Sequence, residues 1–89
     1  MQAVISVTGK DSAGIIAKVS QKCFDCNVNI IDISQSVLKE YFAMIMLVEI
    51  DKLNIAFTQF VDVMNQIGKE NGLSIHTMHE DIFNSMHKI

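Results

Sequence analysis

Residues 29–50 read NIIDISQSVLKEYFAMIMLVEI, and this stretch contains two successive strand patterns with no helical pattern between them. In the first, apolar residues alternate with Asp32, Ser34 and Ser36, which predicts a strand with one apolar and one polar face. The second, Tyr41–Ile50, is apolar on both faces, as expected for a central strand that is covered on both sides. The apolar face of the first strand consists of Ile31, Ile33 and Val37.

On the N-terminal side of this pair, the sequence predicts a strand, a turn and a helix. Ala3–Val7 is rich in β-branched residues, and residues 8–12 are rich in turn-forming residues. From Gly14 onward, apolar residues recur every three or four positions, which is the spacing of an amphipathic helix. Asn27 ends this helix, because Asn readily adopts the left-handed backbone conformation found after helix ends.

On the C-terminal side, a second amphipathic helix is predicted from about Asn54 to the stop signal at Gly72. Leu73–His79 predicts a final strand, and residues 81–89 return to helical spacing. The apolar stripe of the second helix consists of Phe57, Phe60, Val61, Met64 and Ile67.

The resulting order, β-α-β-β-α-β, predicts an α+β fold of the ferredoxin-like type, with an antiparallel sheet, two helices on one face and a short C-terminal helix. The other sheet face then needs a cover. We expect this cover to be a second sheet, a partner subunit or the C-terminal helix, with Met78 and Met86 lining the contact in the last case. The chain is expected to divide into a domain at 1–79 and a helical extension at 80–89.

Composition excludes several classes of function. The chain has 89 residues, 49% of them hydrophobic, and a net charge of −3; its seven basic residues are all lysines, scattered singly. We therefore expect one domain that binds no nucleic acid. No apolar run approaches the length of a membrane span, and no secretory leader pattern begins the chain, so a cytoplasmic location with reduced cysteines is expected. Catalytic and phosphate-loop motifs are absent, which argues against an enzyme and against a bound cofactor.

The segment from Val7 to Ile16, VTGKDSAGII, followed by Asn29 and Ile30 at the start of the next strand, resembles the ACT domain family. The similarity extends over residues 2 to about 79 and is greatest to small proteins that consist of a single ACT domain. It implies a regulatory homodimer, or a higher homo-oligomer, that binds an amino acid or a similar small molecule at the subunit interface. The implied ligand-binding residues are Gly9, Lys10, Asp11, Ser12, Ala13, Gly14 and Asn29.

The chemistry of these residues agrees with that role. The glycines allow close approach of a ligand to the backbone, and the free N–H groups of a helix start can hold a carboxylate. Asp11 could accept hydrogen bonds from a ligand ammonium group, and the Asn29 amide offers both a donor and an acceptor. In a purely structural interpretation, Asp11 or Ser12 only caps the helix and Asn29 only satisfies a turn.

Two further motifs suggest chemistry, but their positions argue for structural roles. Cys23 and Cys26 form a C-x-x-C motif near a helix C-terminus and beside an aspartate, where the thiolate is disfavoured, so we expect buried thiols. His76 and His79 lie three residues apart on a strand and should therefore point to opposite faces, which disfavours a shared metal ion. His87, in the tail, is expected at the surface or at an interface.

Two functions remain open at this point. The first is a dimer that senses a small molecule. The second is a protein-interaction module that modulates a metabolic enzyme or regulator without binding a ligand itself. A change in melting temperature on addition of ligand separates the two.

Overall fold

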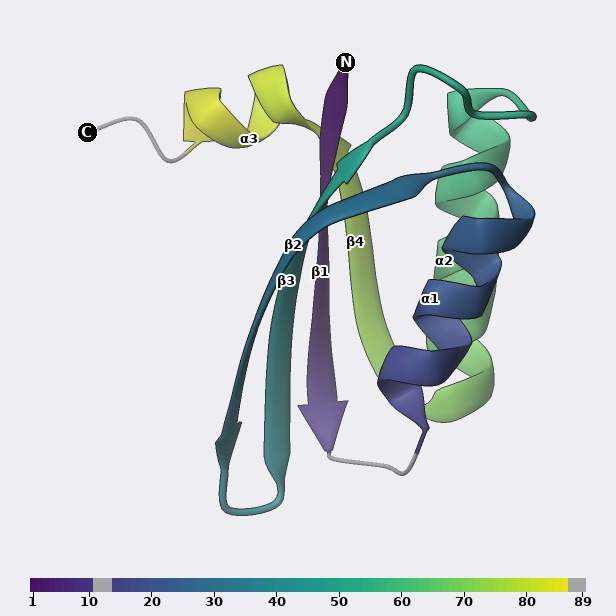
Figure 1. The fold of residues 1–89 in the computed structure, drawn as a ribbon. Helices are drawn as coiled ribbons and strands as arrows, with labels where there is room; N and C mark the ends of the chain where they lie inside the picture. The colour runs from purple at the N-terminus through teal and green to yellow at the C-terminus, as the bar shows by residue number, and fades with distance from the viewer. Residues whose placement is uncertain (11–13, 87–89) are drawn as a thin grey trace.

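The computed structural model describes residues 1–10 and 14–86, and its elements follow the predicted order. The sheet order is β2-β3-β1-β4, and each neighbouring pair of strands is antiparallel. The ferredoxin-like arrangement is therefore confirmed. The elements are β1 (Gln2–Lys10), α1 (Ile15–Asp25), β2 (Asn29–Leu38), β3 (Tyr41–Glu49), α2 (Phe57–Asn71), β4 (Leu73–His79) and α3 (Glu80–Met86) (Figure 1).

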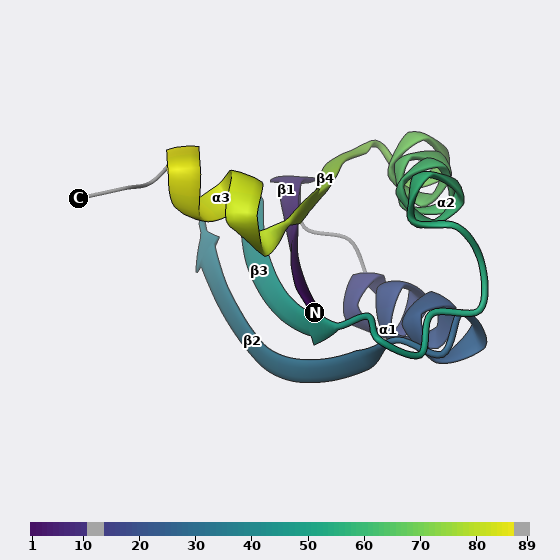
Figure 2. The same ribbon diagram turned by 90° about the horizontal axis from the view of Figure 1, so that it is seen from above.

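Helices α1 and α2 lie side by side on one face of the sheet, and the core fills the space between the two layers (Figure 2). Phe60 and Met64 on α2 are fully buried, as are Met44 and Met46 on β3. The even-numbered residues of β3 thus face the helices, as the alternating pattern predicts. Gly72 ends α2 in a left-handed conformation with φ 66°, as the sequence predicts.

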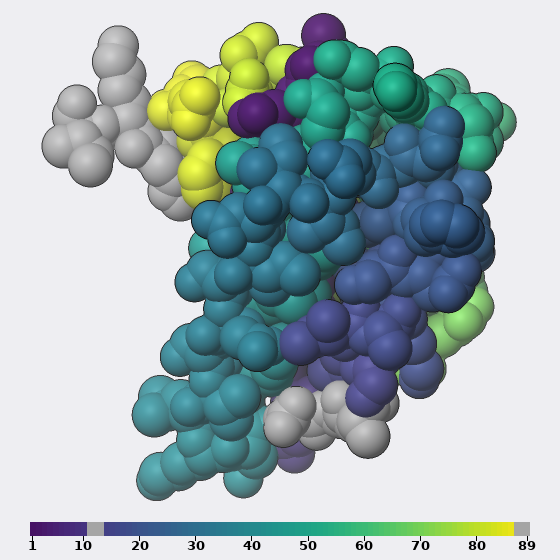
Figure 3. All heavy atoms as spheres, viewed as in Figure 1, coloured from purple at the N-terminus to yellow at the C-terminus, as the bar shows by residue number. Residues whose placement is uncertain are grey.

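Strand β2 forms one edge of the sheet and is exposed along most of its length (Figure 3). Its register against β3 shifts between Ile30 and Asp32, so Ile31 is an extra, unpaired residue of a β-bulge. Ile31 therefore falls outside the regular alternation on which the predicted apolar face was based, and it is 44% exposed. Ile33 and Val37 do share a face, because they pair with Met46 and Phe42, but they are 37% and 56% exposed.

Strand β3 lies inside the sheet, as expected, but only one of its faces is covered by this chain. On the open face, Ile45 is 48% exposed. Helix α3 instead contacts β1 and β4 on the side of the sheet away from α1 and α2, and Val4 of the open face is only 6% exposed (Figure 2). Met78 is half-buried, whereas Met86 is 65% exposed, so the expectation that Met86 lines this contact is wrong.

Several element boundaries differ from the predictions, and three of the differences concern the ends of β1, α1 and α2. β1 continues beyond Val7 to Lys10, because its last residues pair with β3. The N-cap of α1 is Gly14, with φ 81° and no side-chain cap, and the two capping residues that the sequence suggests, Asp11 and Ser12, lie outside the described residues. Helix α2 begins at Phe57 rather than near Asn54, because the Asn54 backbone N–H and side chain donate to carbonyl groups at the end of α1.

Candidate functional site

The predicted ligand loop starts at a close contact between β1 and β4. Gly9 pairs with Leu73 and has φ 156°, and a β-carbon at this position would lie 2.8 Å from Cδ2 of Leu73. This close approach is a structural reason for glycine at position 9. Lys10 is exposed and Gly14 begins α1, while Asp11, Ser12 and Ala13 lie outside the described residues.

Gly9 also lines a shallow depression beside the β2–β3 hairpin, which we call the hairpin hollow. Its volume is about 370 Å³, which lies within the range of small-molecule sites. The hollow is mostly apolar and stands next to the start of the predicted ligand loop. Its lining residues are Thr8, Gly9, Ser36, Leu38, Tyr41, Phe42 and Ala43.

Asn29 does not lie near Gly9 within one chain. Gly9 pairs with Phe42 of β3, whereas Asn29 pairs with Glu49, seven residues further along the same strand. At about 3.3 Å per residue, these two levels of the sheet are about 23 Å apart. A free amino acid therefore cannot touch Gly9 and Asn29 of the same chain. The predicted topology already contained this signal, because the helix after β1 returns the chain to the end of the sheet where β1 began.

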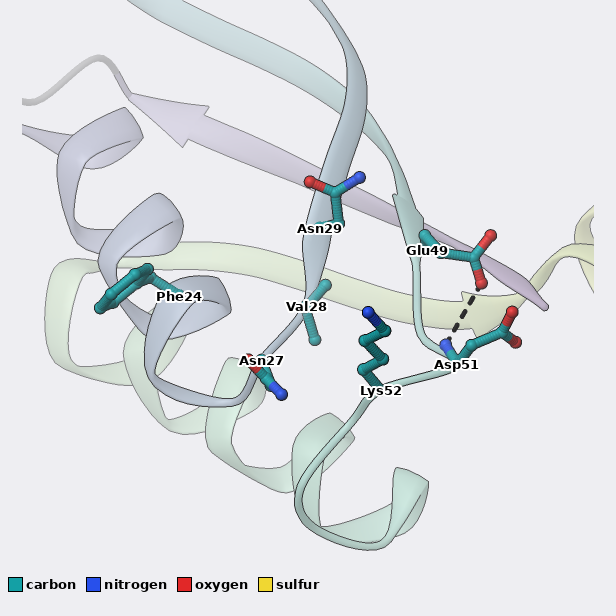
Figure 4. A pocket seen from close by; sticks show the side chains of 7 residues that line it. All are labelled: Phe24, Asn27, Val28, Asn29, Glu49, Asp51 and Lys52. Carbon is teal, nitrogen blue, oxygen red and sulfur yellow. Dashed lines mark hydrogen bonds between the residues drawn. The ribbon is translucent and has the colours of Figure 1, made fainter.

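Asn29 lines a different depression, formed where α1 ends, β2 begins and β3 ends (Figure 4). We call it the Asn29 hollow; its volume is about 490 Å³. Sequence patterns did not single out its charged residues, because Glu49 is the last residue of β3 and Asp51 and Lys52 lie in the turn that follows it. Its lining residues are Phe24, Asn27, Val28, Asn29, Glu49, Asp51 and Lys52.

The two carboxylates of the Asn29 hollow already have hydrogen-bond partners. The α-amino group of Met1 donates to Glu49 Oε1 at 2.9 Å and to Asp51 Oδ1, and the Asp51 backbone N–H donates to Glu49 Oε1 at 3.2 Å. The hydrogen bonds with Asp51 and Glu49 raise the pKa of the α-amino group to about 10. The hydrogen bond from the same amino group lowers the pKa of Asp51.

The remaining polar groups of the Asn29 hollow are an ammonium group and two carboxamides. Within the described part of the chain, the Lys52 ammonium group makes no ion pair, and the side chains of Asn27 and Asn29 make no hydrogen bond. The Lys52 side chain extends between the start of β2 and the end of β3 (Figure 4). These groups are free to bind a polar solute.

The cysteines are buried, as predicted. Cys23 is 0% exposed and Cys26 is 6% exposed, and neither forms a disulfide. Burial, with a smaller contribution from the neighbouring Cys26, raises the pKa of the Cys23 thiol to about 12; burial is also the main cause of the raised pKa of Cys26. Both thiols are thus protonated at neutral pH, which is unfavourable for redox chemistry or metal binding.

The strand histidines point to opposite faces of β4, which confirms the prediction. His76 pairs with Ser6 on the open face, whereas His79 pairs with Ala3 on the helix-covered face. His87 lies outside the described residues. Over residues 1–10 and 14–86, no group of three or more metal-ligating side chains is close enough to hold an ion, and no helix is long and apolar enough to cross a membrane.

Comparison with known proteins places this fold in a family. The family model for the ACT domain matches residues 1–78. The chain belongs to the ACT domain family. ACT domains are regulatory, ligand-binding domains. Over all 89 residues and the whole of each relative, this ACT domain is 45% identical to a UPF0237 protein of Clostridium perfringens and 40% identical to one of Listeria innocua.

Solved structures agree with this assignment. An ACT domain protein from Streptococcus pneumoniae is 40% identical to this ACT domain, with a TM-score of 0.81 and 93% of each chain covered. The regulatory subunit of aspartate kinase from Thermus thermophilus has the same fold, with a TM-score of 0.66 at 23% identity; the match covers 85% of this chain and 49% of that one.

Proposed function

We propose that this ACT domain is a regulatory sensor that binds an amino acid or a related metabolite at the interface of a homodimer. The ligand site would combine residues 9–14 of one protomer with Asn29 of its partner. Residues 1–79 would form the sensing unit and residues 80–89 an extension from it. A cytoplasmic location suits two buried, unpaired cysteines, because that compartment keeps thiols reduced.

The main support for this proposal is the exposed edge strand β2. Ile33 and Val37 of β2 face the helix side of the sheet, yet α1 leaves them 37% and 56% exposed, and Ile16 at the start of α1 is 37% exposed as well. An exposed apolar edge strand can pair with another strand, and a second copy of β2 would cover both its edge and these side chains.

Two-fold pairing of β2 would also account for the separation of Asn29 from residues 9–14. Two identical strands related by a two-fold axis run antiparallel, so the start of one lies beside the end of the other. Asn29 of one protomer would then lie at the level of Leu38 in its partner, which is the level of the partner's Lys10 and ligand loop. The separation of Gly9 and Asn29 prevents one chain from forming the site. Antiparallel pairing of two copies would bring Asn29 of one copy to the level of the loop of the other.

Binding is tested by measuring the melting temperature with each of the twenty standard amino acids. A ligand at ten times its Kd stabilises the folded protein by about 1.4 kcal/mol, which corresponds to a rise of roughly 5–10 °C for a domain of this size. Asn29→Ala should abolish the rise without changing the melting temperature of the free protein by more than about 2 °C. A panel without any shift would favour the protein-interaction module instead.

Pairing through β2 is tested by light scattering on two matched variants. Ile33→Lys places two ammonium groups close to the proposed two-fold axis, so the mass should fall from that of the dimer to that of the monomer. Ile45→Lys introduces the same charge on the open face, at a residue of similar exposure, and should leave the dimer intact. If only Ile45→Lys dissociates the protein, the copies pair through the open face and the proposed site is wrong.

A further inference from the structure

We infer that Lys52 selects ligands that carry a second anionic group, so that the amino acids this protein binds most tightly are the acidic ones. The inference rests on the proposed function, because it assigns the part of the ligand that extends past Asn29 into the Asn29 hollow. Lys52 belongs to the turn after β3 and is contributed by the same chain as Asn29.

The free polar groups of the hollow are suited to an anion. The Lys52 ammonium group carries a full positive charge, and the carboxamides of Asn27 and Asn29 can each donate through their NH₂ groups. None of the three has a partner within the described residues. A ligand carboxylate is an acceptor that all of them can bind, and such charge-assisted hydrogen bonds are stronger than neutral ones.

The acidic residues of the hollow are both bound to another cation. Glu49 and Asp51 lie at its β3 end and accept hydrogen bonds from the Met1 α-amino group, whose single positive charge offsets one of their two negative charges. A cationic ligand would have to compete with that amino group. An anionic ligand would instead meet Lys52, the cation of the hollow that has no counter-ion in the described structure.

The two ends of the ligand are thereby assigned to two protomers. In the proposed site, the loop of one protomer binds the α-carboxylate and α-ammonium groups common to all amino acids. The side chain then points toward the partner's Asn29 and Lys52. Recognition by this second end would distinguish aspartate and glutamate from their neutral amides, which have nearly the same size and shape.

The test is calorimetric titration of the full chain with aspartate, glutamate, asparagine, glutamine and lysine. For an exposed lysine, we expect the better acidic amino acid to bind roughly 2- to 5-fold more tightly than its amide. Lys52→Gln should remove this preference while binding of the amide is retained. Lys69→Gln, which removes another exposed lysine that lies on α2 and does not line the hollow, should leave the preference unchanged.

A second variant tests the same hollow without changing its net charge. Asn27 has φ 64°, so Asn27→Gly removes the carboxamide but preserves the left-handed backbone. It should weaken binding of the acidic ligand more than that of its amide. Binding of all five amino acids with no acidic preference would overturn the inference and leave the proposed function standing, and a preference for lysine would do the same. Absence of any binding would overturn both.

Discussion

Gly68 on α2 lies directly against Ile75 on β4. A β-carbon added at Gly68 would lie 3.2 Å from Cγ1 of Ile75 and 2.7 Å from the carbonyl oxygen of Leu73. The missing side chain allows α2 to approach the edge strand β4 closely. The absence of a β-carbon therefore sets the spacing between the helix layer and this edge of the sheet.

Gly68→Ala should destabilise the protein by about 1–3 kcal/mol, because the added methyl group would force the helix away from backbone atoms that cannot give way. In an open helix the same substitution stabilises by about 1 kcal/mol, so the sign itself is diagnostic. Urea unfolding measures the difference. Gly72→Asn is the control, because a β-carbon there meets no atom within 4 Å and Asn tolerates the left-handed backbone. A Gly68→Ala protein as stable as the original would contradict the close contact.

Phe60 and Phe24 offer a direct comparison of a buried and an exposed ring. Phe60 is 0% exposed at the centre of the core, whereas Phe24 is 77% exposed on α1. Phe60→Ala should lower the free energy of unfolding by about 3–5 kcal/mol, and Phe24→Ala by no more than about 0.5 kcal/mol. Both values come from chemical denaturation. Similar losses for the two variants would mean that Phe24 is buried in the assembly that exists in solution.

The buried thiol of Cys23 should make the fold sensitive to alkali. Its pKa rises from 9.0 to about 12 on folding, so the folded protein keeps a proton that the unfolded chain releases above pH 9. The stabilisation that results is complete below pH 9 and is lost as the pH rises from 9 toward 12. Melting temperatures of the original protein and of Cys23→Ala, measured from pH 7 to pH 11, should converge above pH 9. Two parallel curves would contradict the raised pKa.

The same burial predicts slow thiol labelling. At pH 8, a disulfide reagent should label neither Cys23 nor Cys26 in the native protein, and it should label both after unfolding in urea. Rapid labelling of both thiols in the native state would restore the redox interpretation of the C-x-x-C motif.

Removal of residues 80–89 should expose the end of the open face that α3 covers. α3 contacts β1, and Val4 on the open face of β1 is 6% exposed, so loss of α3 should increase its accessibility to solvent. We expect lower solubility or a larger assembly by light scattering, together with stronger binding of an apolar dye. A shortened chain with unchanged solubility and mass would show that α3 is not needed as a cover.

Sequence patterns predicted the order of the elements because each has a clear period. Alternation identified β2, a continuous apolar run identified β3, and the stripe through Phe60 and Met64 identified α2. The positions of Gly72 and Asn27 at helix ends also followed from residue type, and both have positive φ values. These features depend on neighbours close in sequence, so local physical chemistry determines them.

The remaining features depend on contacts between distant segments. The delayed start of α2 reflects hydrogen bonds from Asn54 to the end of α1, which no local pattern encodes. The charged groups around Asn29 come from the N-terminus and from residues 49–52, and they meet only in the folded chain. Whether Asn29 joins residues 9–14 across a dimer stays a prediction, because that contact would involve a second chain.

The bulge at Ile31 lets an extra residue enter β2 without changing the order of its two faces. Ile30 pairs with Val48 and Asp32 pairs with Leu47, which are neighbours on β3. A chain lacking Ile31 would therefore keep Ile30 and Ile33 on the helix side of the sheet and Asn29 on the open side. The deletion would remove only the local bend, and β2 would pair with β3 as one uninterrupted ladder.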